Sequence, residues 1–170
     1  MVCVFEVSST ENPNFKRLIH LSADHTFEDF HKIIQDSCNY DQTQLASFFL
    51  TDDNWRRKIE ICSLDPGETD PKQVSMHNTK LRKYLAEPGQ KLVYVFHFFN
   101  ERLFYLELKE KNMKKDLKEP FVAYERGNAP LQFQENDYDS REVETLDLND
   151  SYQSFGDLED YYEIFGEMDA

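Results

Sequence analysis

Histidine, cysteine and serine side chains are the groups of this 170-residue chain that could support catalysis or metal binding. The five histidines are scattered. None belongs to an HExxH pattern, and no paired-carboxylate motif accompanies them. The three cysteines, Cys3, Cys38 and Cys62, are spaced too widely along the chain for a zinc motif. The sequence therefore predicts no catalytic, cofactor-binding or metal-binding residue, and no cofactor.

An enzyme remains the alternative from a different functional class. A nucleophile needs a base within hydrogen-bond reach, and the sequence does not show which side chains are neighbours in space. A cleft in which His31 meets an acid and either Ser37 or Cys38 would support this alternative.

Apolar side chains near the C-terminal end have a spacing that suits binding to a protein. They follow the i, i+3, i+4, i+7 pattern of a helix that lies in a groove, and they are Leu158, Tyr161, Tyr162 and Phe165. We predict an amphipathic helix over residues 155–166, with Ser154 as its N-cap and these four side chains as partner-binding anchors. A solvated acidic tail with chance periodicity explains the same spacing equally well.

Charge is distributed unevenly along the chain. Residues 135–170 hold thirteen acids and one base, Arg141, whereas residues 1–134 hold twenty acids and eighteen bases. The near-neutral first part lacks the strongly basic balance of a DNA-binding domain, so we do not expect the intact chain to bind nucleic acid. We predict a domain over residues 1–134, an acidic tail over residues 135–170, and a protein partner that is basic.

Two hairpins and a helix are expected in the first half of the chain. Alternating apolar residues predict strands over residues 2–7 and 15–21 and over residues 45–50 and 55–62. Between these hairpins Thr26 begins a capping box, and the apolar residues that follow at helical spacing are Phe27, Phe30, Ile33, Ile34 and Cys38. In the second hairpin, strict alternation places Trp55, Arg57 and Ile59 on one face of the strand.

The second half is expected to begin with a loop over residues 64–77 and a short helix that Asn78 caps, with Leu81, Tyr84 and Leu85 on its apolar side. Strands over residues 91–99 and 102–108 follow. The first of them is apolar on both faces, so it is either covered on both sides or exposes a patch, and the acidic tail is the candidate cover. The lysine-rich run over residues 109–118 is interpreted as a solvated connector, and residues 121–124 as an extended piece.

Several short motifs occur within residues 1–134 in a fixed order. They are Arg17-Leu-Ile-His-Leu with Thr26, Phe30-His31 and Ile34; Tyr40-Asp41 with Leu45 and Phe48; and Leu81, Tyr84-Leu85 and Glu87-Pro88-Gly89 with Tyr94. This order resembles the plasmid pRiA4b Orf-three-like family of insertion-element passenger proteins. The resemblance implies an α+β fold with a mixed sheet and a helix after the first hairpin, and it brings no established activity or cofactor.

One family motif is altered in this chain. Where relatives tend to show an Asp-Phe-Gly-Asp-x-Trp hairpin, residues 97–102 read His-Phe-Phe-Asn-Glu-Arg, so no functional role is carried over to them.

The expected fold is α+β, with a mixed, largely antiparallel sheet, a helix after the first β-hairpin and an acidic C-terminal tail. The chain start has no basic segment before an apolar run, and no stretch reaches the length of a bilayer-spanning helix, so we expect a cytoplasmic protein with reduced thiols. The leading functional hypothesis is a non-enzymatic binding or adaptor module that uses its acidic segment to bind a basic protein or its own folded domain. The alternative is a weak nucleic-acid-binding domain masked by that segment.

Overall fold

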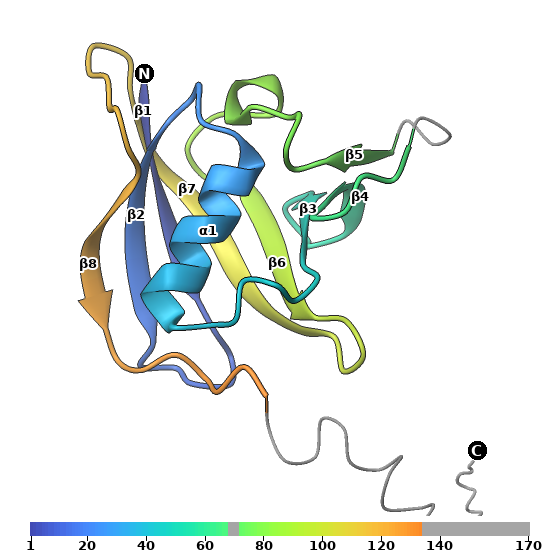
Figure 1. The fold of residues 1–170 in the computed structure, drawn as a ribbon. Coiled ribbons are helices and arrows are strands. Elements are labelled where there is room, and N and C mark those ends of the chain that lie inside the picture. The colour runs from blue at the N-terminus through green and yellow to red at the C-terminus, as the bar shows by residue number, and fades with distance from the viewer. Residues whose placement is uncertain (68–71, 134–170) are drawn as a thin grey trace, which may run out of the picture. The chain divides into compact units, whose positions relative to one another are not determined.

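One eight-stranded sheet organises residues 1–67 and 72–133, which are the residues that the computed structural model describes (Figure 1). Its spatial order is β5-β4-β3-β6-β7-β1-β2-β8, and every neighbouring pair is antiparallel except β4 and β5. The strands are β1 Val2–Ser8, β2 Lys16–Ser22, β3 Ser47–Thr51, β4 Arg57–Cys62, β5 Gln73–Ser75, β6 Lys91–His97, β7 Arg102–Asn112 and β8 Phe121–Arg126. A mixed, largely antiparallel sheet with a helix after the first hairpin is therefore confirmed.

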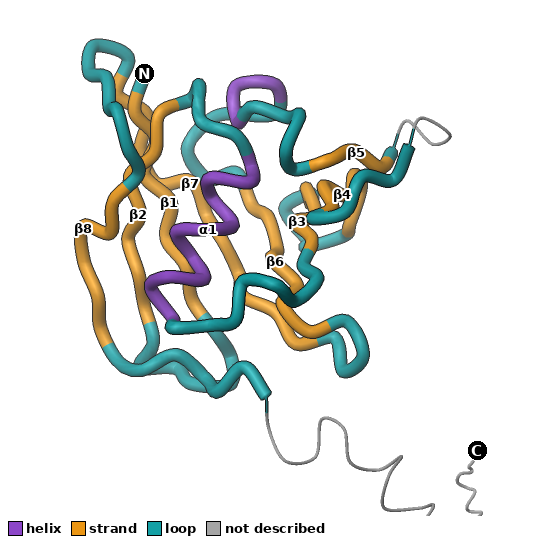
Figure 2. Tube along the Cα trace, in the orientation of Figure 1, coloured by secondary structure: helices purple, strands orange, loops and turns teal. Residues whose placement is uncertain are grey.

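Helix α1, Phe27–Cys38, lies across one face of the sheet (Figure 2). The predicted capping box is present, because the Thr26 hydroxyl accepts the Asp29 N–H and the Asp29 carboxylate accepts the Thr26 N–H. The helix ends at Asn39, which adopts the left-handed conformation that commonly terminates helices. The capping box and Asn39 therefore define both ends of α1.

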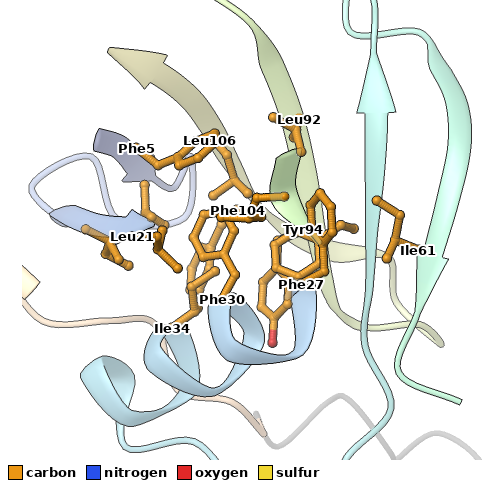
Figure 3. Packing of buried hydrophobic residues seen from close by; sticks show 14 of the residues in the cluster. Phe5, Leu21, Phe27, Phe30, Ile34, Ile61, Leu92, Tyr94, Phe104 and Leu106 are labelled. Atoms are coloured by element: carbon orange, nitrogen blue, oxygen red, sulfur yellow. The ribbon is translucent and has the colours of Figure 1, made fainter. Parts of the chain in front are cut away.

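The core lies between α1 and the sheet (Figure 3). Phe30 and Ile34 of α1 are fully buried and belong to the same cluster as Tyr94 of β6 and Phe104 of β7. Aromatic rings stack or tilt against one another throughout this layer, with centroids 4.9 Å apart for Phe5 and Phe30. Such pairs add about 0.5–1.5 kcal/mol each beyond their burial, so the core holds α1 firmly on the sheet.

Strand β6 is buried on both faces, as its apolar residues predict. Leu92, Tyr94 and Phe96 belong to the core beneath α1. On the opposite face Val93 and Val95 are only 3% and 1% exposed, although the described residues place no helix there. On this face Val93 pairs with Phe49 of β3 and with Tyr105 of β7, so two aromatic side chains flank it.

Three expectations for the second half of the chain are wrong. The short helix is a single 3₁₀ turn, η1 Leu81–Lys83, and its N-cap position is Lys80 rather than Asn78. The expected loop over residues 64–77 contains β5, which pairs parallel to β4. Strand β7 continues to Asn112, so the first residues of the lysine-rich run belong to the sheet.

The predicted alternation in the second hairpin is also wrong. Trp55 lies in the turn with a positive φ, and β4 begins only at Arg57. A β-bulge between Leu50 and Thr51 shifts the register. As a result Ile59 packs against the core, whereas Arg57 lies over the Phe49 ring on the opposite face.

The acidic segment over residues 135–170, with the amphipathic helix predicted at 155–166, lies outside the described residues. Within residues 1–67 and 72–133, no helix is both long and apolar enough to cross a membrane.

Candidate protein-binding groove

Three exposed apolar side chains meet around one hollow in the surface. Leu45, Leu64 and Phe98 are 49%, 62% and 41% exposed, and all three line a groove of about 310 Å³. Large side chains of this type are usually removed from water, and a cluster of them around a hollow is typical of an interaction site. We call this feature the Leu45–Leu64–Phe98 groove.

The strand register explains why these three residues meet. Leu45 stands just before β3, Leu64 just after β4 and Phe98 just after β6. Ser47, the first residue of β3, pairs with Cys62 at the end of β4 and with Val95 near the end of β6. Antiparallel pairing therefore brings the start of β3 and the ends of β4 and β6 to the same end of the sheet.

Two carboxylates, Glu60 and Asp65, also line the groove, and none of the described residues that line it is a lysine or arginine. The Glu60 carboxylate accepts hydrogen bonds from the Ser47 hydroxyl at 2.8 Å and from the Gln73 amide at 2.9 Å, so it is held in place. The groove can therefore accept an apolar side chain while offering negative charge to a neighbouring cation.

The cysteine in this groove is poorly suited to nucleophilic chemistry. Burial, together with the nearby Glu60 carboxylate, raises the pKa of the Cys62 thiol to about 11. A thiolate is the reactive form of cysteine, and at neutral pH this thiol stays protonated.

His31 is part of a buried polar cluster in the core. Its Nδ1 lies 2.7 Å from the Tyr94 hydroxyl, which also accepts a hydrogen bond from the Gln35 amide. Burial lowers the pKa of His31 below its ordinary value, so the ring is neutral at pH 7. Because the Tyr94 hydroxyl accepts from Gln35, it donates its own hydrogen bond to Nδ1 of the neutral ring, which is a structural role for this histidine.

The structure does not bring His31 together with Ser37 or Cys38. His31 lines a small cavity with Glu28 and Lys32, whereas Ser37 and Cys38 line a different one. Burial also raises the pKa of the Cys38 thiol to about 11. The arrangement that would have supported nucleophilic chemistry is therefore not formed.

The cations near Trp55 are held by neighbouring acids and rings. Arg57 forms an ion pair with Glu101 at 3.1 Å, and Arg56 lies 3.7 Å from a carboxylate oxygen of Asp52. The Trp55 ring packs edge-on against Tyr105 with centroids 4.7 Å apart. These contacts give both arginines an acidic neighbour and fix the Trp55 ring against β7.

Two further results concern the residues considered from the sequence. The predicted anchors Leu158, Tyr161, Tyr162 and Phe165 lie outside the described residues. Among the residues that are described, no group of three or more histidine, cysteine or acidic side chains is arranged to hold a metal ion.

The sequence did not predict the Leu45–Leu64–Phe98 groove, because its members are far apart in the chain and lie outside the strands. The available signal was the position of Leu45 and Leu64, apolar residues that border the two strands of a predicted hairpin.

Comparison with known proteins places the chain in a family. The family model described as plasmid pRiA4b ORF-3-like protein matches residues 4–133. A similar fold occurs in the crystal structure of a protein of unknown function, MM3350 from Methanosarcina mazei Go1, with a TM-score of 0.56 and 20% sequence identity. That similarity covers 73% of this chain and 68% of the other, and it concerns the fold alone. No curated protein matches. The family model covers most of the chain and confirms the resemblance that the motifs indicated: the chain belongs to the plasmid pRiA4b ORF-3-like protein family.

Proposed function

We propose that this chain is a non-enzymatic binding module for a basic protein partner, and that the Leu45–Leu64–Phe98 groove is its docking site. The observation that carries the proposal is the meeting of three exposed apolar side chains around one hollow that two carboxylates border. An apolar anchor in a pocket supplies most of the energy of a typical interface, and charge at its border selects the partner and speeds the encounter.

The acidic segment over residues 135–170 supports the same partner chemistry. Its net charge of −12 attracts a basic surface over a distance of about 10 Å at 0.1 M salt. Its apolar anchors, proposed from sequence spacing, are Leu158, Tyr161, Tyr162 and Phe165. We propose that the segment provides electrostatic attraction and a second contact, and that binding takes place in the cytoplasm. The mobile-element association that the resemblance implies is part of the same proposal.

The groove is tested by exchanging one exposed apolar residue in the full chain. Leu64→Ser is expected to reduce recovery of a partner from an extract of the source cells by about 30-fold, the effect of losing one strong interface contact. Met113→Ser is the matched control, because Met113 is 70% exposed and lies outside the groove. Equal recovery with the two variants would contradict the groove as docking site.

The same recovery assay tests the segment. Tyr162→Ala combined with Phe165→Ala removes two proposed anchors, and Tyr138→Ala combined with Tyr152→Ala removes two rings outside the proposed helix face. We expect loss with the first pair only. An unchanged recovery with the first pair would remove the segment from the proposal. Tight nucleic-acid binding at low salt by a chain lacking residues 135–170 would favour the masking alternative instead.

A further inference from the structure

Arg17 of β2 is a buried arginine with part of its guanidinium unused. The residue is 5% exposed, and its guanidinium carbon lies 4.5 Å from the centre of the Phe15 ring. The hydrogen bonds that Arg17 makes within the described residues all start at Nη1, which donates to three backbone carbonyls, those of Lys16, Arg126 and Gly127. Its Nε is buried and has no hydrogen-bond partner. A buried donor of a charged group without a partner is costly, so this nitrogen calls for an explanation.

No carboxylate among the described residues forms an ion pair with Arg17, although a buried charge normally has a counter-ion. Glu125 of β8 is the cross-strand neighbour of Arg17, but its side chain is exposed and makes no ion pair with the guanidinium. Backbone carbonyls and the Phe15 ring stabilise the guanidinium, but within the described part of the chain it has no carboxylate counter-ion.

The side chain of Arg17 lines a cavity of about 330 Å³, which is within the size range of small-ligand sites. One wall comes from the end of α1 and its cap, with Cys38 and Asn39, and the other from the segment after β8. That segment contributes an amide, Asn128, and an apolar run formed by Ala129, Pro130 and Leu131. The cavity thus combines a cation, amides and apolar surface.

We propose that this cavity binds a small organic carboxylate, whose oxygens accept hydrogen bonds from the Nε edge of Arg17. A guanidinium binds a carboxylate through two parallel N–H groups, and the edge that carries Nε is the one left because Nη1 is used by the backbone. Since Nε is buried and unpartnered, a carboxylate oxygen reaches it only when the cavity lining moves slightly aside. A carboxylate suits the site better than a doubly charged phosphate, since Glu125 is nearby and Arg17 is the only cation among the described residues that line the cavity. The apolar run after β8 would contact the organic part of the ligand.

The site is separate from the Leu45–Leu64–Phe98 groove, because the two cavities share no residue. The inference therefore goes beyond the proposed function, and either can fail without the other.

The test follows the side-chain N–H signal of Arg17 by nuclear magnetic resonance in the full-length protein. Formate, acetate, propionate and butyrate are titrated as sodium salts at constant ionic strength, with chloride and inorganic phosphate as comparison anions. The Arg17 Nε–Hε signal is expected to shift and saturate with carboxylates at millimolar concentrations. Each added methylene is expected to tighten binding by up to about fourfold as it contacts the apolar wall.

Two substitutions near the cavity, Asn128→Asp and Glu125→Gln, leave the guanidinium in place and change only the charge around it; a third, Asn54→Asp, is the control. Asn128→Asp has nearly the same shape and puts a competing carboxylate in the cavity lining, so binding is expected to weaken by more than about tenfold. Asn54→Asp makes the same change of charge in an exposed turn and should leave the affinity unchanged. Glu125→Gln removes the neighbouring negative charge and should tighten binding.

Three results would overturn the proposal. They are a non-saturating Arg17 signal with every carboxylate, a preference for phosphate over carboxylates, and equal affinities in the Asn128→Asp and Asn54→Asp variants. In the first case Arg17 is only a structural clamp for the backbone around β8.

Discussion

At the scale of single residues, the polar cluster of His31, Gln35 and Tyr94 is the least expected feature of the core. Tyr94 is fully buried in β6, and its hydroxyl reaches two side chains of α1. Buried polar groups need partners, and here each partner comes from an element far away in the sequence. The cluster fixes the rotation of α1 on the sheet, because other rotations would leave the hydroxyl without partners.

This cluster predicts a pH dependence of stability. Burial lowers the pKa of His31 in the folded state, whereas an unfolded chain has a histidine pKa of about 6.5. As the pH falls below about 6.5, the unfolded state therefore takes up the proton first, and the free energy of unfolding decreases. Urea denaturation at pH 7.5 and 5.5 should show a smaller loss for His31→Asn than for the unmodified chain. His77→Asn, at an exposed histidine, is the control, and equal losses in the two variants would contradict the role of His31.

The sequence predicts which apolar residues of α1 are buried, but it does not predict the polar contacts of the helix. Phe27, Phe30 and Ile34 follow the period of a helix, and all three are buried as predicted. The contact between His31 and Tyr94 joins residues 63 positions apart, and no local pattern reports it. The same limit applies to Arg17, which in the sequence is one polar residue in a strand.

At the scale of elements, β2, β8 and the segment after β8 are tied together by backbone contacts. Gly127 has a φ of +73° directly after β8, and its carbonyl accepts a hydrogen bond from Arg17. A Cβ atom at this position would lie 2.6 Å from the Asn14 carbonyl oxygen. The chain can therefore pass Asn14 at this point only because residue 127 has no side chain.

Gly127→Ala is expected to destabilise the protein by about 1–3 kcal/mol, because a backbone atom cannot move away cheaply. Gly89→Ala is the matched control, since Gly89 has a positive φ as well but no atom within 4 Å of the added methyl group. The difference between the two free energies of unfolding, measured in urea, isolates the clash. A Gly127 variant that is no less stable than the Gly89 variant would show that this close approach is absent in solution.

The elements that the sequence predicted wrongly are held by contacts from outside their own segment. After η1 the backbone bonds to the Gln90 side chain instead of to a further helical turn: the Gln90 amide donates to the Tyr84 carbonyl, and its oxygen accepts the Ala86 N–H. Strand β5 has only three residues and forms because Gln73 and its neighbours bond to β4. Periodicity cannot predict either feature, because tertiary contacts override local preference.

At the scale of the whole molecule, the family, the fold class and the hairpin order could be predicted, since they depend on motif order and strand patterns. The candidate site could not, because Leu45, Leu64 and Phe98 meet only when three strands adopt their register. We propose that a second protein occupies the groove that these residues form.

That claim is tested most directly by a photo-reactive phenylalanine analogue placed at position 98 in the full-length protein and activated inside the source cells. Position 121 is the control, because Phe121 and Phe98 are 43% and 41% exposed, but Phe121 begins the edge strand β8 whereas Phe98 follows the central strand β6. We expect a covalent adduct with a distinct basic protein from position 98, and none with that protein from position 121. Equal adducts from both positions, no adduct from position 98, or adducts only with the chain's own residues would contradict it.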